Sequence, residues 1–185
     1  MRVIAGTARG TRLKAPKNYS VRPTADRVKE ALFSIIGPRV ASALFIDFYA
    51  GSGAVGIESL SRGARLCIFV DNSKDNILLI KENLLITKLE QNSRLIMADV
   101  DNAIVNLAAE QIRADLIYLD PPYDCNNILT AIKSIFTNKI ITDNGLLVVE
   151  HSRYNRQWTD YFTGIRQKKY GNTFLTFISP VNLSC

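Results

Sequence analysis

Residues 44–56 read LFIDFYAGSGAVG, an apolar run followed by a turn that contains three glycines. Residues 44–48 have the length and composition of a buried β-strand, and the residues after the turn suit a helix. Gly51, Gly53 and Gly56 show the spacing GxGxxG at this junction. Glycine lets the backbone turn tightly and approach a ligand closely. The segment therefore predicts a site for a nucleotide-like cofactor, without saying which one.

The chain continues this pattern in both directions. Apolar residues from Val28 to Ile36 recur at helical spacing, so we expect a helix that Thr24 caps and that Gly37-Pro38 ends. Short apolar runs that alternate with amphipathic stretches are typical of a parallel sheet. Strands are expected at residues 44–48, 66–70, 94–97, 115–119 and 146–150, and helices at about 54–62, 73–86, 101–113, 126–138 and 153–163.

Both ends of the chain depart from this alternation. Near the C-terminus, Ile165–Tyr170 and Thr173–Ser179 flank Gly171-Asn172, a typical two-residue hairpin turn. Near the N-terminus, Arg2–Ala5 and Thr11–Lys14 predict a short basic β-hairpin. We therefore expect one α/β domain, with a mostly parallel seven-stranded sheet and a C-terminal antiparallel hairpin. Residues 1–23 would form an N-terminal extension and residues 24–185 the core.

An aspartate stands at the end of each of the first four predicted strands: Asp47, Asp71, Asp99 and Asp120. An acid that caps the following helix would explain one or two of them. Four acids at the same sheet edge fit a single cleft better, because ligands of open α/β sheets bind beyond the carboxyl ends of the strands. If the strand order is 3-2-1-4-5, Gly51 and Asp120 flank the same crevice.

Asp47 bears on the choice of cofactor. A carboxylate at this loop would repel a pyrophosphate, at a cost of about 1 kcal/mol in water and more when partly buried. S-adenosylmethionine has no phosphate and carries an ammonium and a sulfonium, so we favour it over NAD. Asp71 follows Gly51 by 20 residues, where an acid can accept both ribose hydroxyls, and Asp99 can accept from the adenine amino group. The expected cofactor-binding residues are Asp47, Tyr49, Ala50, Gly51, Gly53, Asp71, Asn72, Asp99 and Val100.

A second motif, LDPPYD at residues 119–124, follows the fourth predicted strand. Together with the glycine loop it resembles the class I, Rossmann-like methyltransferases that modify exocyclic or amide nitrogens. The amino group of a base is a poor nucleophile, and Asp120 and the carbonyl oxygen of Pro121 can each accept one of its N–H bonds. Pro122 would stiffen the elbow, and Tyr123 would stack on a flipped base. The expected catalytic residues are therefore Asp120, Pro121, Pro122 and Tyr123.

A closer resemblance covers almost the whole chain. The sequence is similar to the bacterial 16S ribosomal RNA guanine-N2 methyltransferases of the small subunit, with a mild change at Phe48-Tyr49, where Leu-Phe would be expected. The resemblance implies that S-adenosylmethionine is the cofactor and that the substrate is one guanine of 16S RNA in an assembling or assembled small subunit. It rests on Arg2–Gly6, Ala8–Gly10, Arg22–Phe33, Gly51–Ala54, Gly56–Glu58, Ser61–Ala64, Asp120–Tyr123, Val148–His151 and Tyr170–Thr173.

Charge is spread unevenly along the chain. The formal net charge is +6, yet residues 1–40 contain nine Lys and Arg residues and only two acids. Such asymmetry favours a polyanionic partner for this segment, and the resemblance implies that the basic hairpin grips RNA. Phosphate contacts position a target without reading its sequence. The candidates for these contacts are Arg2, Arg9, Arg12, Lys14 and Arg22.

Other classes of protein fit less well. Three widely spaced cysteines and one histidine, His151, favour neither a zinc site nor a disulfide framework. A membrane span would need a longer apolar run, so a cytoplasmic protein, expected to be monomeric, is predicted. The alternatives left open are an adenine-N6 or cytosine-N4 DNA methyltransferase, a protein-glutamine methyltransferase, a non-catalytic cofactor-binding scaffold and a dehydrogenase.

Overall fold

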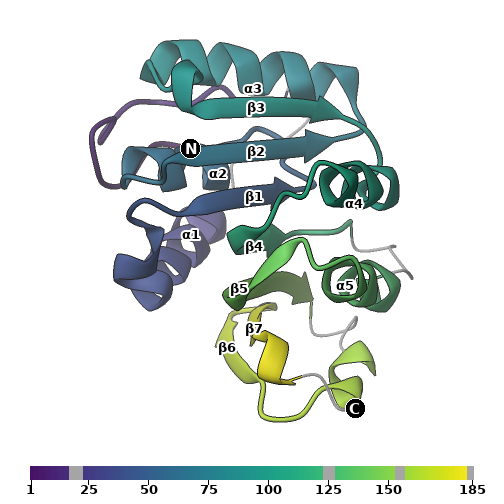
Figure 1. Ribbon diagram of the computed structural model, residues 1–185. Helices are drawn as coiled ribbons and strands as arrows, with labels where there is room; N and C mark the ends of the chain where they lie inside the picture. Colours follow the sequence, from purple (N-terminus) through teal and green to yellow (C-terminus); the bar gives the residue numbers. More distant parts are fainter. Residues whose placement is uncertain (17–22, 123–127, 153–156, 183–185) are drawn as a thin grey trace.

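The computed structural model describes residues 1–16, 23–122, 128–152 and 157–182 (Figure 1). Seven strands form one sheet in the order β3-β2-β1-β4-β5-β7-β6, which confirms the expected 3-2-1-4-5 core with an added hairpin. The first five strands are parallel, and β7 is antiparallel to both β5 and β6. The strands are β1 (Leu44–Phe48), β2 (Leu66–Asp71), β3 (Ser93–Met97), β4 (Ala114–Leu119), β5 (Ile141–Ser152), β6 (Arg166–Tyr170) and β7 (Thr173–Ile178).

Helices cover both faces of this sheet. Residues of α1, α2 and α3 share one apolar core with one face, and residues of α4 and α5 share a second core with the other. Neighbouring residues of β1 divide between them: Phe45 belongs to the first core, and Ile46 and Phe48 to the second. The helices are α1 (Pro23–Ile36), α2 (Ala54–Ser61), α3 (Lys74–Thr87), α4 (Val100–Ala109) and α5 (Ile128–Thr137), with 3₁₀ turns η1 (Gly37–Val40), η2 (Glu90–Asn92), η3 (Gln157–Tyr161) and η4 (Pro180–Asn182).

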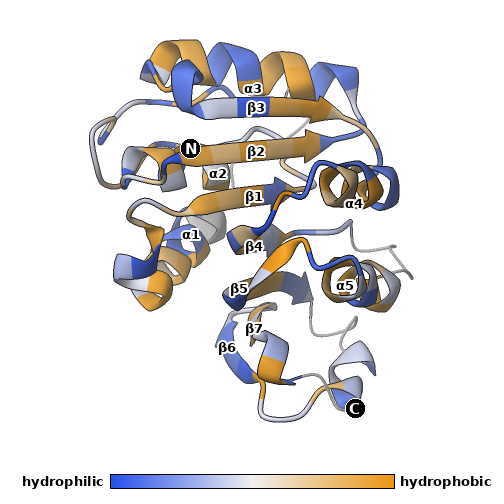
Figure 2. Ribbon diagram, viewed as in Figure 1, coloured by the Kyte–Doolittle hydropathy of each residue, from blue (hydrophilic) through white to orange (hydrophobic). Residues whose placement is uncertain are grey.

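The central strands are mostly apolar because both of their faces are covered, as in other parallel sheets. Every residue of β1 is buried, and β1 and β2 are largely orange, the hydrophobic colour, in Figure 2. The edge strand β6 reads RQKKY and is mostly blue in the same view. Exposed lysines on an edge strand oppose pairing with another chain. In the described residues, every helix is too short or too polar to cross a lipid bilayer.

Several elements differ from their predicted extent. Helix α1 begins at Pro23, one residue before the predicted cap Thr24, and α4 ends at Ala109, four residues before the predicted end. Strand β5 begins at Ile141, five residues before the predicted start, and its register against β4 shifts after the Ala114–Ile141 pair. The turn-like residues 142–145 predict a break, but a bulge absorbs them within the strand. The helix expected at 153–163 is the 3₁₀ turn η3; residues 153–156 lie outside the described residues.

The basic N-terminal segment, residues 1–14, pairs with itself as predicted, but less extensively. One isolated antiparallel bridge joins Arg2 to Arg12 in place of two strands. The reason is that backbone N–H groups of the segment form hydrogen bonds with α2. The Glu58 carboxylate accepts from the backbone N–H groups of Ile4 at 2.8 Å and Ala5 at 3.0 Å. The N-terminal segment is thus fixed to the second helix of the core.

Candidate active site

The site lies where the carboxyl ends of β1 and β4 meet, the point at which the strand order reverses. Asp120, directly after β4, donates its backbone N–H to the carbonyl oxygen of Phe48 at the end of β1, at 3.5 Å. The glycine loop and the Asp-Pro-Pro elbow therefore begin side by side, as the predicted order implies. Two hollows open at this edge, one beside the glycine loop and one beside the elbow.

The glycine loop passes from β1 into α2 through left-handed backbone. Tyr49, Gly51 and Gly53 have φ angles of 59°, 56° and 74°, a conformation that glycine adopts without strain. Gly56 has a different role, because a Cβ atom there would lie 2.2 Å from the ring of Phe69. The first two glycines therefore shape the turn, and Gly56 lets α2 pack closely on β2.

Asp71 ties this loop to the end of β2. Its Oδ2 accepts from the backbone N–H of Gly51 at 2.8 Å, and its Oδ1 accepts from the Ser73 N–H at 2.9 Å and from Asn76 Nδ2 at 3.1 Å. Asp71 is buried but lines the hollow beside the loop. A carboxylate oxygen offers two lone pairs, so only one acceptor position remains, on Oδ2, which suffices for one of the two ribose hydroxyls that we expected Asp71 to bind.

Asp47 lies beneath the loop, where it is 1% exposed, and its Oδ2 accepts from the Gly56 N–H at 2.8 Å. Burial raises the pKa of Asp47 to about 8, although the Gly56 hydrogen bond opposes this. The carboxyl therefore carries less than a full charge at pH 7. Asp47 therefore repels a pyrophosphate less strongly than we expected from a full negative charge. It would affect cofactor binding mainly by holding the glycine loop in place.

Asp99 is exposed and caps α4. Its oxygens accept from the backbone N–H of Asn102 at 2.9 Å and from the Asn102 side-chain amide at 2.7 Å. These hydrogen bonds, the backbone one first, lower the pKa of Asp99, so the group stays ionised at pH 7. Helix capping thus accounts for its place in the sequence, and it still faces the hollow beside the glycine loop.

That hollow, the cofactor cleft, has a volume of about 150 Å³. Among the described residues that line it, three carry carboxyl groups and none is basic. Such a lining disfavours a pyrophosphate and suits a ligand with positive charge. S-adenosylmethionine, with its ammonium and sulfonium, fits this chemistry. The lining residues are Tyr49, Val70, Asp71, Asn72, Ala98, Asp99, Val100, Asp101 and Ala131.

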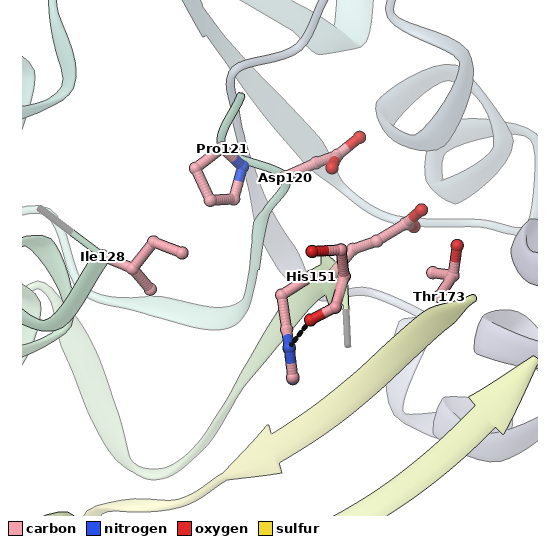
Figure 3. Close-up of a pocket in the computed structure, with 7 residues that line it drawn as sticks. Asp120, Pro121, Ile128, His151 and Thr173 are labelled. Carbon is pink, nitrogen blue, oxygen red and sulfur yellow. Dashed lines mark hydrogen bonds between the residues drawn. The ribbon is translucent and has the colours of Figure 1, made fainter. Parts of the chain in front are cut away.

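The second hollow, the elbow pocket, is shown in Figure 3. Asp120 and Pro121 directly follow β4, and Thr173 is the first residue of β7, so the elbow and the C-terminal hairpin line the same pocket. Pro121 is buried and Pro122 is exposed. The pocket is lined by Asp120, Pro121, Ile128, Glu150, His151, Ser152 and Thr173.

Two acids share the elbow pocket. Loss of hydration, and then the charges of Glu150 and Asp47, raise the pKa of Asp120, although water limits this rise because the residue is exposed. Burial raises the pKa of Glu150, whose Oε2 accepts a hydrogen bond from the Tyr118 hydroxyl. Burial also raises the pKa of Tyr118 well above its usual value, so the phenol keeps the proton that it donates.

Two acids of the site were not predicted: Asp101, which lines the cofactor cleft, and Glu150. Glu150 could have been found from the sheet register. It directly follows Val149, which pairs with Leu119 in the parallel ladder, just as Asp120 directly follows Leu119. Acids immediately after two paired residues of neighbouring strands would have been the signal. We missed it because strand 5 was read only as the end of the core sheet.

His151, whose role the sequence leaves open, is part of the core of the hairpin. Its Nδ1 donates to the carbonyl oxygen of Ser152 at 3.0 Å, which leaves Nε2 to accept from the Thr176 hydroxyl at 2.8 Å. The imidazole lies 5.6 Å from the ring of Phe174 and 5.1 Å from that of Trp158. Both ring nitrogens are engaged, and His151 is 4% exposed, so its position favours a structural role.

The predicted RNA-binding residues are only partly described. Arg2, Arg9, Arg12 and Lys14 are all exposed. Lys14 forms an ion pair with Glu82 at 3.0 Å. Arg22 and the predicted stacking residue Tyr123 lie outside the described residues. In the part of the chain that the structure describes, no cluster of His, Cys, Asp or Glu is arranged to hold a metal ion.

Comparison with known proteins places this site in context. The model of the family described as conserved hypothetical protein 95 matches residues 1–179. YlbH of Bacillus subtilis, provisionally named an rRNA methyltransferase, is 38% identical over 83% of this chain and 83% of its own. The protein named ribosomal RNA small subunit methyltransferase D of Haemophilus influenzae is 33% identical over 81% of this chain and 78% of its own.

Solved structures share the fold. The hypothetical protein TTHA0928 of Thermus thermophilus superposes with a TM-score of 0.81 at 28% identity, over 97% of this chain and 99% of its own. SMU.776, a methyltransferase by description and solved in complex with SAH, has a TM-score of 0.69 at 16% identity, over 85% of this chain and 50% of its own. The fold is thus the Rossmann-like fold of S-adenosylmethionine-dependent methyltransferases, which confirms the predicted fold class.

Proposed function

Because the chain belongs to the family described as conserved hypothetical protein 95, we propose that it is a cytoplasmic, S-adenosylmethionine-dependent methyltransferase of the small-subunit ribosomal RNA. Its relative YlbH is named for rRNA methylation, and small subunit methyltransferase D is named for methylation of the small-subunit RNA. We further propose that the acceptor is the exocyclic N2 amino group of one guanine in 16S rRNA. The protein would meet this guanine in an assembling or assembled small subunit.

One observation carries the proposal: the acidic cofactor cleft and the Asp120 elbow open at the same sheet edge. The cleft has three carboxyl groups and no basic residue among its described lining, and the elbow presents an exposed carboxylate. Among the described residues, no donor hydrogen-bonds to the Asp120 carboxylate. An acceptor with no partner of its own, next to a site for a cationic cofactor, suits an amino-group substrate.

The chain's residues would act on the nucleophile. S-adenosylmethionine supplies an electrophilic methyl group. The Asp120 carboxylate and the Pro121 carbonyl oxygen accept the two N–H bonds of the guanine N2, which turns its lone pair toward the methyl carbon. As the N–C bond forms, the S–C bond breaks, and the surplus N2 proton passes along the Asp120 hydrogen bond and on to water. No deprotonation is needed before transfer.

The exposed arginines of the N-terminal segment, Arg2, Arg9 and Arg12, would hold RNA phosphates. Tyr123 is expected to stack on the flipped guanine, and Arg22 to add a further phosphate contact. These assignments rest on residue type and on place in the chain.

The test is methyl transfer from labelled S-adenosylmethionine to small subunits that lack the modification, followed by digestion to nucleosides. Label in N2-methylguanosine is expected. Label in a methyladenosine, in a methylcytidine or in ribosomal protein would support S-adenosylmethionine as the cofactor but show that guanine N2 is not the acceptor. Binding of NAD without binding of S-adenosylmethionine, measured by calorimetry, would overturn the cofactor.

A further inference from the structure

Glu150 lies in the elbow pocket together with Asp120, and the mechanism above gives it no role. Both side chains line the pocket, and both residues directly follow paired positions of β4 and β5. The Tyr118 hydroxyl donates to Glu150 Oε2. Among the described residues, no donor contacts Glu150 Oε1, so the acceptor positions of this oxygen are unused.

The closeness of the two carboxylates costs free energy, and a ligand that donates hydrogen bonds to both can offset this cost. Two carboxylates in one pocket repel each other, and each makes ionisation of the other harder. Apart from the Tyr118 hydroxyl, the pocket brings no donor to either carboxylate in the described residues. A ligand that places two N–H groups side by side, one toward each acid, would satisfy both.

Guanine carries such a pair on its Watson–Crick edge: the N1–H donor next to the N2 amino group. Adenine and cytosine do not, because the ring nitrogen beside their amino group is an acceptor. A second carboxylate beside the first therefore favours guanine and repels the other two amino bases. Flipped bases are read through hydrogen bonds on this edge, and a buried acceptor left without a donor costs binding energy.

We propose that Glu150 determines the base specificity of the enzyme, accepting the N1–H of the target guanine while Asp120 accepts an N–H of N2. This deepens the proposed function and rests on guanine being the acceptor. Tyr118 is a positioning residue: its hydroxyl fixes one oxygen of Glu150, which leaves the other turned to the base. Asp120 on its own does not distinguish guanine from adenine, since both present an amino group.

The test replaces the target guanosine, once mapped, by 2-aminopurine riboside in a ligated 16S RNA that is assembled into small subunits. This base keeps the amino group at position 2 and has an acceptor at N1. The wild-type protein should methylate the guanosine substrate about 10- to 100-fold faster in kcat/KM, the range expected for one hydrogen bond to a charged group. Equal rates would overturn the proposal.

Glu150→Gln provides the second arm, because an amide can accept from N1–H or donate to an N1 acceptor. The guanosine rate should fall and the 2-aminopurine rate should rise, so that the ratio moves toward one. An unchanged ratio would overturn the proposal even if both rates fell. Glu110→Gln is the matched control, because Glu110 pairs with Arg94 outside both hollows. The ratio of the guanosine rate to the 2-aminopurine rate should be the same in this variant as in the wild type.

Tyr118→Phe keeps the ring and removes only the hydroxyl, so it tests the same idea if Glu150→Gln does not fold. The ratio of the guanosine rate to the 2-aminopurine rate should fall less than in Glu150→Gln. No fall at all would show that the Tyr118 hydroxyl does not position Glu150. Failure of the underlying function looks different. In that case the wild-type protein yields no N2-methylguanosine from the guanosine substrate, which overturns both proposals together.

Discussion

Asp120 and Asp47 stand at the ends of neighbouring strands, but their surroundings separate their roles. Asp120 is exposed, and no described donor reaches its carboxylate. Asp47 is buried and holds the backbone of α2. A carboxylate that contacts the substrate and one that supports a loop should respond differently to mutation, the first in turnover and the second in stability.

Asp120→Ala should abolish methylation and leave the affinity for S-adenosylmethionine nearly unchanged, because we propose that the side chain acts on the acceptor nitrogen. A loss of at least about 100-fold in kcat is expected, the size of an effect on transition-state hydrogen bonds. Single-turnover rates and calorimetric titration of the cofactor measure the two quantities. Asp120→Asn keeps one acceptor oxygen and should retain more activity than the alanine variant. Equal loss of binding and turnover would contradict this division of roles.

Asp47 should make stability depend on pH. The pKa of about 8 in the folded protein exceeds the usual 3.8, so between these values the folded state binds the proton more tightly. The stabilising contribution is therefore complete below about pH 4 and is lost as the pH rises through 8. Urea unfolding should show that Asp47→Asn flattens this decline, on the order of a few kcal/mol. The same slope in both proteins would contradict the assignment.

At the scale of elements, α2 does two things at once. Its start carries the glycine loop, and its C-terminal half carries Glu58 and Ser61, which hold the N-terminal segment. Asn83 of α3 adds a second link, donating to the carbonyl oxygens of both Lys14 and Ser52. The basic segment is therefore packed against the elements that form the cofactor loop.

Gly6→Ala should detach this segment, because a Cβ atom at Gly6 would lie 1.7 Å from the carbonyl oxygen of Ser61. Gly10 is the matched control: its φ of 86° resembles the 84° of Gly6, but the space around it is open. Gly10→Ala should cost about 1 kcal/mol from backbone strain alone, and Gly6→Ala clearly more. The free energy of unfolding and the affinity for small subunits are the two measurements. Equal effects of both substitutions would show that close packing at Gly6 is unimportant.

Glu58→Gln should destabilise the protein by roughly 3–5 kcal/mol, since it leaves the charge of Lys29 buried without its partner. Lys29 and Glu58 are 4% and 0% exposed and lie 3.3 Å apart. Glu82→Gln removes the exposed pair with Lys14 and should change the free energy of unfolding by less than about 1 kcal/mol. Urea titration of both variants tests the contrast. Similar values for the two would mean that burial does not matter here.

Much of this element structure follows from local sequence, and the exceptions have physical causes. The runs at 44–48 and 115–119 are mostly apolar and are each followed by a turn motif, so their strands could be predicted nearly to the residue. The bulge in β5 could not, because pairing with β4 overrides turn-forming residues. The contact between Tyr118 and Glu150, 32 residues apart, depends on strand register, and the ties of Glu58 to the N-terminus depend on how α2 docks.

At the scale of the whole molecule, charge separates two functions. Three exposed arginines, Arg2, Arg9 and Arg12, lie on the N-terminal segment, and three carboxyl groups, with no basic residue among the described lining, line the cofactor cleft. A polyanion would be drawn to the former and kept out of the cofactor cleft. The resulting orientation presents the bases of the RNA, and not its phosphates, to the acids.

Replacing Arg2, Arg9 and Arg12 together by alanine should weaken binding to small subunits and make it less dependent on salt. If each contacts one phosphate, the slope of log K against log salt should become shallower by roughly 2–3 units. Filter binding from low to high salt measures this. Lys139→Ala, an exposed change in the loop after α5, is the control. An unchanged slope in the triple variant would place the RNA interface elsewhere.

The attachment of the N-terminal segment to α2 also fixes the distance between that segment and the cofactor loop. Helix α2 has eight residues, which at 1.5 Å per residue make a rod about 12 Å long. One end is fixed to the loop beside the cofactor and the other to the segment that we expect to hold phosphates. If this segment holds the RNA phosphates as proposed, the distance from those phosphates to the methyl group is fixed. We expect the enzyme to select its guanine partly by distance, modifying the nucleotide that reaches the elbow when the RNA is held at that separation.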